Sequence, residues 1–283
     1  MILQYITWDL EPQIIDFGSF ELRYYSLMFG LGFILGYYIL ARFFRREGIS
    51  IELLDKLTFY VIIATIIGAR FGHCLFYEPE EYLTNPLKII LPFTGKIGVD
   101  FRFTGYQGLA SHGGAIGILI GLGLFSMKYK QPFLGLLDKI SVVTALAACF
   151  IRLGNLFNSE IYGVATDLPW GVKFMRESLY GVPVEEIVPK HPTQIYESIA
   201  YLLIFIVLIL LYNKKSSALK QGFILGLFLI STFVSRFLIE FVKEDQVNFE
   251  EGMFLNMGQW LSIPFIIFGI YLLIRKPKQT ITE

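Results

Sequence analysis

The sequence has little charge and little cysteine. Charged residues make up 17% of its 283 positions, whereas soluble domains have about 25%. The 24 Lys and Arg are balanced by 24 Asp and Glu, and without a basic stripe we expect no nucleic-acid partner. Cys74 and Cys149 lie in apolar segments without the spacing of a disulfide framework, so we expect free thiols. Three scattered histidines without ligand spacing predict no metal site.

Long apolar runs are what the sequence has in excess, since 54% of its residues are hydrophobic. Runs close to the ~20 residues that cross a bilayer as a helix predict an all-α polytopic membrane protein with seven transmembrane helices. The runs cover roughly residues 24–41, 57–77, 104–127, 140–158, 198–213, 221–241 and 252–274.

The positions of Lys and Arg predict the orientation. If the N terminus lies outside, these residues cluster in the short inner connections and are sparser in the longer outer loops. The basic clusters fall within residues 42–56, 128–139, 214–220 and 275–278. Because cytoplasmic loops carry an excess of Lys and Arg, we expect an outside N terminus and a cytoplasmic C terminus.

Two proline-rich loops are predicted on the outer side. Residues 78–105 predict an extracytoplasmic arm of short elements, and residues 159–194 predict a small extracytoplasmic head. Neither is large enough to form an independent core, so we treat residues 1–283 as a single integral-membrane domain. Residues 1–22 are expected to lie at the membrane interface, with Trp8 as one anchor.

A polar segment follows the fourth apolar run. Residues Arg152 to Gly163 read RLGNLFNSEIYG, which places a guanidinium, two carboxamides and a carboxylate at the end of a hydrophobic stretch. Ionisable groups at membrane depth need partners or a ligand. Arg152 and Asn155, three residues apart, share a helical face, and Glu160 follows them. The segment is therefore predicted to form part of a binding site.

A second arginine, Arg236, lies near the outer end of the sixth run, four residues before Glu240. The predicted topology places Arg236 and Arg152 at similar depth. Two guanidiniums at one depth predict a phosphate clamp, because the planar fork matches phosphate oxygens. Glu160 and Glu240 would then hold the arginines when no anion is bound. The alternative is a plain salt bridge between Arg236 and Glu240 that ties helices together.

His112 lies at the outer end of the third run, directly before Gly113. Imidazole is the side chain best suited to take a proton near neutral pH, and small residues let a helix or a lipid head group approach the backbone. We therefore consider His112 as a base, against the alternative that a lone histidine in an apolar chain is structural. Ser111 lacks the glycine spacing of a nucleophile elbow, which argues against a serine hydrolase.

Two further motifs have structural interpretations. Tyr24 fits an interfacial aromatic belt, whereas Tyr25 either joins that belt or points inward toward a head group. The segment His191 to Glu197, HPTQIYE, leads into the fifth run with Pro192 at its first turn, which is typical of a helix start. We interpret this segment as structural.

Taken in order, these motifs resemble those of the bacterial prolipoprotein diacylglyceryl transferase family over nearly the whole chain. The ordered set is specific, whereas His-Gly-Gly alone is weak. The matching segments are Arg23-Tyr-Tyr25, Gly68-Ala-Arg70, His112-Gly-Gly114, Arg152 to Gly163, His191 to Glu197, and Arg236 to Glu240. The sequence departs from the family pattern at Ile151 and Leu156, where the family usually has Gly and Phe. Both departures are apolar packing changes that leave the polar groups in place.

The resemblance implies a reaction in the bacterial inner membrane. The diacylglyceryl group of phosphatidylglycerol would pass to the lipobox cysteine of a prolipoprotein signal peptide, forming a thioether and releasing glycerol phosphate. The thiolate, rather than the thiol, is the nucleophile, and the departing phosphate oxygen needs stabilisation. No cofactor is required, because the leaving group is already a phosphate ester.

The resemblance and the chemistry together predict roles for individual residues. His112 would be the base, Arg152 and Arg236 the anion clamp, and Glu240 a partner of the clamp. The predicted substrate-binding residues are Arg152, Asn155, Tyr25, Glu160, Gly163 and Gly113.

Two other classes of protein fit part of the pattern. A transporter or lipid-binding protein would also hold an anion between arginines, although the sequence lacks the internal repeat of many secondary transporters. Another lipid-modifying enzyme, such as an acyltransferase, would favour a histidine with a neighbouring acid. The nearest acidic residue before His112 is Asp100, which is too distant for such a pair.

Overall fold

The computed structural model describes the chain with several gaps. The described residues are 5–16, 21–85, 89, 93–94, 102–103, 108, 110–215, 218–244 and 253–276. The chain divides into two compact units, which we describe separately. Unit 1 comprises Met1–Leu40 and Leu137–Glu283, and unit 2 comprises Ala41–Leu136.

The protein is mostly helical, and six of the described helices are long and apolar enough to cross a membrane. They are α1 (Tyr24–Arg46), α2 (Ile51–Phe76), α6 (Phe133–Phe157), α7 (Thr193–Lys215), α8 (Phe223–Ile239) and α9 (Met257–Ile274). The predicted all-α polytopic class is confirmed. The remaining expected span coincides with α5 (Ser111–Tyr129), whose 19 residues are long enough. It is not one of the six helices that are both long and apolar enough to cross a membrane.

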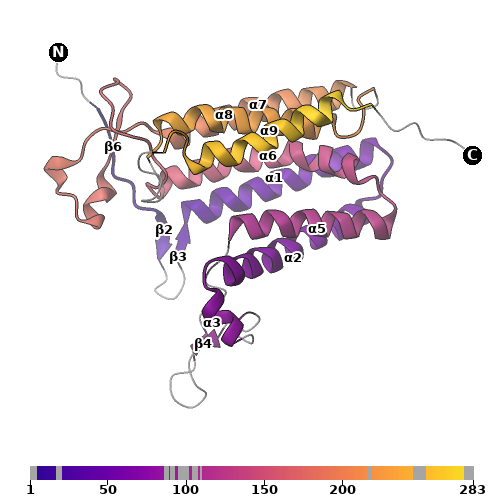
Figure 1. Ribbon diagram of the computed structural model, residues 1–283, viewed down its shortest axis with the longest axis horizontal. Coiled ribbons are helices and arrows are strands. Elements are labelled where there is room, and N and C mark those ends of the chain that lie inside the picture. Colours follow the sequence, from indigo (N-terminus) through magenta and orange to yellow (C-terminus); the bar gives the residue numbers. More distant parts are fainter. Residues whose placement is uncertain are drawn as a thin grey trace, which may run out of the picture. The chain divides into compact units, whose positions relative to one another are not determined.

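In unit 1 the helices α1, α6, α7, α8 and α9 run alongside one another (Figure 1). A small residue brings α1 close to α6, because Gly32 lies against Ala147. Helix α6 contacts α7 where Cys149 Sγ lies 3.1 Å from Ser198 Oγ. Both cysteines of the chain are free thiols, as predicted. Helix α7 packs on α8, and α8 packs on α9.

A buried carboxylate fixes the start of α8. Asp138 of α6 accepts hydrogen bonds from the backbone N–H groups of Gly222 (2.7 Å) and Leu225 (2.8 Å). The N-cap residue of α8, Gly222, offers no side-chain cap of its own, and first-turn N–H groups need acceptors. A negative charge at this end also suits the helix dipole. Asp138 therefore ties α8 to α6, at the opposite end of α6 from Arg152.

The N-terminal segment is part of the region predicted as the head. Strand β1 (Ile6–Trp8) pairs in parallel with β6 (Val172–Phe174). Trp8 is partly buried and packs against the buried residues Leu156, Val172 and Phe174; its role as an interfacial anchor stays a prediction. The other short elements of unit 1 are β2 (Gln13–Asp16), β3 (Glu21–Arg23), η1 (Met175–Tyr180), η2 (Val184–Glu186) and η3 (Glu240–Val242).

In unit 2, α2 and α5 approach each other through glycines (Figure 1). A Cβ at Gly72 would lie 2.6 Å from Gly113 Cα, and a Cβ at Gly113 would overlap the carbonyl oxygen of Gly68. Gly113, Gly117 and Gly121 follow at intervals of four residues and form one face of α5. Such small-residue faces let helix backbones pack closely in lipid.

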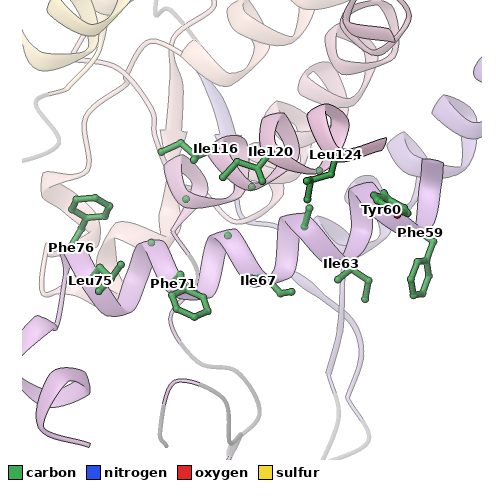
Figure 2. A pocket seen from close by; sticks show the side chains of 16 residues that line it. Phe59, Tyr60, Ile63, Ile67, Phe71, Leu75, Phe76, Ile116, Ile120 and Leu124 are labelled. Atoms are coloured by element: carbon green, nitrogen blue, oxygen red, sulfur yellow. The ribbon is translucent and has the colours of Figure 1, made fainter. Parts of the chain in front are cut away.

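An apolar groove of about 720 Å³ runs along this helix pair (Figure 2). Among the described residues, no charged side chain lines it. A surface of this composition suits contact with hydrocarbon rather than catalysis. The large side chains on its walls are Phe59, Ile63, Ile67 and Phe71 from α2, and Ile116, Ile120 and Leu124 from α5.

Arg70 anchors the segment predicted as the arm. Its Nε donates to the carbonyl oxygen of Ile89 (3.1 Å), and its guanidinium lies 4.7 Å from the ring centre of Tyr82. The arginine within the second apolar run therefore has a structural function. The short elements of this segment are α3 (Pro79–Thr84), β4 (Phe93–Thr94) and β5 (Arg102–Phe103).

Candidate active site

A chain of hydrogen bonds links the end of α6 to the turn after it. Arg152 Nη1 donates to Asn155 Oδ1 (3.0 Å), and Asn155 Nδ2 donates to Glu160 Oε1 (2.8 Å). Asn158 Nδ2 donates to the same carboxylate oxygen (3.2 Å). A left-handed residue, Ser159 (φ 54°), turns the chain so that Glu160 faces α6. The prediction that Arg152 and Asn155 share a helical face is confirmed.

The ion partner of Arg152 lies on α7. Arg152 Nε is 2.8 Å from Glu197 Oε2, and the Glu197 side chain is fully buried. That oxygen nevertheless accepts no hydrogen bond from any described residue, so the Nε–H is close to it without being directed at it. A buried ion pair is stabilising only when its geometry is good. The guanidinium therefore retains capacity to bind another anion.

The start of α7 explains why Glu197 reaches this place. Gln194 Nε2 donates to the carbonyl oxygen of Glu160 (2.8 Å), and Thr193 Oγ1 donates to the carbonyl oxygen of Ile161 (2.8 Å). Both side chains are fully buried, and they fix α7 against the turn after α6. The segment that we interpreted as structural therefore also supplies a charged member of the site. Its only signal in the sequence was a carboxylate directly before an apolar run, about one turn after Pro192.

Lys243 joins the cluster from the segment after α8. Its Nζ lies 3.6 Å from Glu197 Oε1 and 3.5 Å from Glu240 Oε2. We expected Glu240 to hold Arg236 at a spacing of four residues. Within the described part of the chain, the salt bridge of Glu240 is with Lys243 and not with Arg236. The physical reason is space, since the Glu240 carboxyl group fills the position that Gly258 of α9 leaves open.

Arg236 is partly buried on α8. It acts electrostatically on both Tyr201 and Lys243, and Arg152 acts on the same two side chains. Tyr201 Oη in turn lies 3.5 Å from Glu197 Oε1, to which it donates. Arg236 and Arg152, on separate helices, thus both lie within electrostatic range of Tyr201 and Lys243.

Gly163 lies where three segments of the chain cross. Its N–H donates to the carbonyl oxygen of His191 (2.8 Å), and it forms an antiparallel bridge with Lys243. A Cβ at this position would overlap the carbonyl oxygen of Val242 and lie 2.7 Å from the Cβ of His191. Gly163 therefore permits the close approach that holds the Lys243 segment beside α7.

Tyr25 at the start of α1 faces α6. Its ring covers the backbone of Gly154, where a Cβ would lie 2.8 Å from Tyr25 Cδ2. Its electrostatic neighbours are Glu160 and Arg152. Of the two interpretations that the sequence left open for Tyr25, this packing agrees with the inward one.

His112 and Gly113 belong to unit 2. His112 is exposed on the first turn of α5. Gly113 is buried against Gly68 and Gly72 of α2, so in this unit its backbone is covered by a helix rather than open to a head group. The role of His112 as a base stays a prediction.

The cluster in unit 1 contains as many cations as carboxylates. Its cations are Arg152, Arg236 and Lys243, and its carboxylates are Glu160, Glu197 and Glu240.

Burial lowers the pKa of Lys243, the two carboxylates Glu197 and Glu240 oppose that effect, and the two arginines add to it. No group of three or more His, Cys, Asp or Glu among the described residues is placed to hold a metal ion. The arrangement is suited to binding an anion with guanidinium groups.

Comparisons with known proteins point to one family. A family model described as prolipoprotein diacylglyceryl transferase matches residues 12–275. A Bacteroides fragilis protein named phosphatidylglycerol-prolipoprotein diacylglyceryl transferase is 44% identical over 270 residues, which cover 95% of this chain and 95% of that protein. A protein of the same name from Tolumonas auensis is 41% identical, over 97% of this chain and 98% of its own length. One from Porphyromonas gingivalis is 42% identical, over 99% of this chain and 97% of its own length.

Proposed function

This chain belongs to the prolipoprotein diacylglyceryl transferase family, and we propose that its buried charge cluster holds the phosphate of phosphatidylglycerol during the transfer. The chain is a multi-pass membrane transferase of lipoprotein biosynthesis, which transfers a diacylglyceryl group from phosphatidylglycerol to a prolipoprotein. One observation carries the site proposal: Arg152 is oriented by Asn155 but makes no directed hydrogen bond to its ion partner Glu197.

The reaction joins sulfur to carbon. The lipobox cysteine, as a thiolate, attacks the glycerol carbon that bears the phosphate. A carbon–sulfur bond forms, the carbon–oxygen bond breaks, and the electron pair leaves with the oxygen of glycerol phosphate. The thiol proton passes to a base, for which we propose His112. Because negative charge builds on the departing oxygen, donors already aimed at it lower the barrier.

Arg152 and Arg236 are the donors in this proposal. Guanidinium stays protonated and offers a planar fork that matches phosphate oxygens. The electrostatic action of both arginines on Tyr201 and Lys243 supports a shared site. Asn155 holds the Nη1 group of Arg152, and Tyr201 also hydrogen-bonds to the guanidinium. In this proposal the phosphate takes the N–H groups of the fork that remain.

The remaining residues of the site orient the head group. Glu160 holds the Asn155 carboxamide, whose oxygen faces Arg152. Tyr25, packed on Gly154 and near Glu160, would donate its hydroxyl to the glycerol head group. Gly163 acts through the backbone crossing that carries Lys243.

The membrane arrangement completes the proposal. With 19 residues, α5 is about 28 Å long, close to the ~30 Å of a hydrocarbon core, and it serves as the seventh span. The N terminus then lies outside and the C terminus in the cytoplasm of a bacterial inner membrane, in agreement with the basic clusters. Residues 78–105 and 159–194 form the extracytoplasmic arm and head.

The experiment uses purified full-length protein, phosphatidylglycerol and a peptide with a lipobox cysteine, and the peptide is weighed by mass spectrometry. We expect a mass gain of one diacylglyceryl group, which disappears when the peptide cysteine is replaced by alanine. Arg152→Ala should remain folded in a thermal melt and lose turnover. Wild-type turnover in that variant would overturn the site, whereas no mass gain from folded wild-type protein would overturn the reaction.

The base is tested separately by His112→Gln. We expect turnover to fall at neutral pH and to recover in part as the pH rises, because thiolate then forms without a base. Full activity of this variant at neutral pH would remove His112 from the mechanism and leave the arginine site untouched.

A further inference from the structure

Lys243 is a buried lysine to which the proposed reaction assigns no function. Its side chain is 3% exposed, and its Nζ lies 3.6 Å from Glu197 Oε1 on α7 and 3.5 Å from Glu240 Oε2 on η3. Both distances are longer than a hydrogen bond. The Oε2 atoms of both carboxylates also accept no hydrogen bond from the described residues. The ammonium group therefore lies near two carboxylates and forms a short hydrogen bond with neither of them.

Glu197 lies between two cations. Arg152 Nε contacts its Oε2, and Lys243 Nζ lies near its other oxygen, Oε1. The Glu197 side chain is 0% exposed, so water cannot replace a lost partner. Removing one partner of a buried ion pair is strongly unfavourable, because it leaves an uncompensated charge in a medium of low dielectric constant. Arg152 can turn toward a lipid phosphate only if another cation stays beside Glu197.

We propose that Lys243 is a positioning residue, which replaces Arg152 as the cation of Glu197 when Arg152 binds the lipid phosphate. This inference rests on the proposed function of Arg152. Before the lipid binds, Arg152 and Lys243 share the carboxylate. When the lipid is bound, the guanidinium turns to the phosphate and the ammonium group closes the 3.6 Å gap to Glu197 Oε1. Without Lys243, a buried carboxylate would face the phosphate and repel it.

The surroundings of Lys243 favour this exchange. Burial lowers the pKa of Lys243, Glu197 and Glu240 raise it, and Arg152 and Arg236 lower it. A bound phosphate neutralises the two arginines and so weakens their effect on the lysine. The ammonium form is thus favoured at the step in which Glu197 depends on it.

The backbone around Lys243 is held in place, so the exchange needs only side-chain movement. Lys243 forms a bridge with Gly163, and the N–H of Val164 donates to the carbonyl oxygen of Val242 (3.0 Å). A lysine side chain has four rotatable carbon segments and a point charge. A fixed backbone with a flexible stem suits a cation that must move by less than one ångström.

The first test is Lys243→Met, which keeps the length of the side chain and removes its charge. We expect KM for phosphatidylglycerol to rise roughly tenfold or more, the loss expected for one charged contact, with a smaller change in kcat. Lys243→Arg should restore most of the affinity. The matched control is Lys214→Met, which removes an exposed lysine near the C-terminal end of α7. An unchanged KM in folded Lys243→Met would overturn the inference.

The second test separates this role from a merely structural one. Glu197→Gln in the Lys243→Met background removes the carboxylate that needs a cation, so KM should return toward the wild-type value. If the two substitutions instead add to a still higher KM, the inference is wrong. If Lys243→Met alone fails to fold, the test uses only the double variant Lys243→Met with Glu197→Gln. A raised KM for phosphatidylglycerol in that double variant would likewise overturn the inference.

These outcomes are distinct from a failure of the proposed function. Activity of Arg152→Ala at the wild-type rate would remove the phosphate clamp itself. Loss of activity in Arg152→Ala together with an unchanged KM in Lys243→Met would retain the clamp and reject only the exchange of cations at Glu197.

Discussion

Replacing Arg152 with lysine keeps the positive charge and removes the planar fork. One guanidinium now donates from Nη1 to Asn155 Oδ1 (3.0 Å) and places Nε 2.8 Å from Glu197 Oε2. A lysine ammonium is a single point charge, so it cannot hold both groups and also bind two phosphate oxygens. A hydrogen bond to a charged group contributes about 1.5–3 kcal/mol. At about 1.36 kcal/mol for each tenfold in rate, losing one such bond lowers kcat/KM by about 10- to 150-fold.

The assay for Arg152→Lys measures kcat/KM for phosphatidylglycerol with a lipobox peptide and detection by mass spectrometry. Asn155→Leu removes the acceptor that orients Nη1 and should give a loss of similar size. The matched control is Arg45→Lys, which changes an exposed arginine near the C-terminal end of α1 and should leave kcat/KM unchanged. If Arg152→Lys keeps kcat/KM within about twofold of the wild type, the positive charge alone suffices and the planar fork of Arg152 is not needed to bind the phosphate.

Three further predictions concern the supports of the site. Gly163→Ala should push Val242 away from the crossing and lower both Tm and activity; normal values of both would show that the crossing tolerates a side chain. Asp138→Ala removes two hydrogen bonds at the start of α8 and should lower the free energy of unfolding by about 2 kcal/mol, measured by denaturation in detergent. Lys190 is paired with Glu244 (2.7 Å), and although burial lowers its pKa, Glu244 leaves that pKa above the ordinary value. The stability lost in Lys190→Met should therefore be constant between about pH 6, where the partner carboxylates are ionised, and about pH 10.4. It should shrink as the pH rises further, and a loss that grows above pH ~10.4 would contradict this sign.

The helices could be predicted from the sequence because spanning hydrocarbon is a property of a local run of residues. Six of the expected runs coincide with long apolar helices. The third run is the exception: its helix, α5, is not among the six, and glycines on its surface let it pack closely against α2. At Gly113 and Gly117, close packing of two helices requires a residue without a side chain, whereas hydrophobicity along one helix favours a large apolar residue. The apolar pattern of the sequence indicates only the hydrophobicity.

The candidate site could be predicted only where its contacts are local. Arg152 and Asn155 meet because three residues separate them on one helix. The contacts of Glu197 and Lys243 depend on how three distant segments come together, and no spacing in the sequence encodes that. Glu240 shows the limit of spacing rules, because its pairing with Arg236 was expected from the helix period and was changed by the absence of a side chain at Gly258.

The parallel pairing of β1 with β6 sets an order of assembly. Residues Ile6–Trp8 leave the ribosome long before Val172–Phe174, and a parallel pair so distant along the chain cannot close until most of the protein has been made. Trp8 also covers Leu156, which lies between Arg152 and Glu160. Residues Ile6–Trp8 can therefore take their place beside the turn after α6 only once β6 has been made.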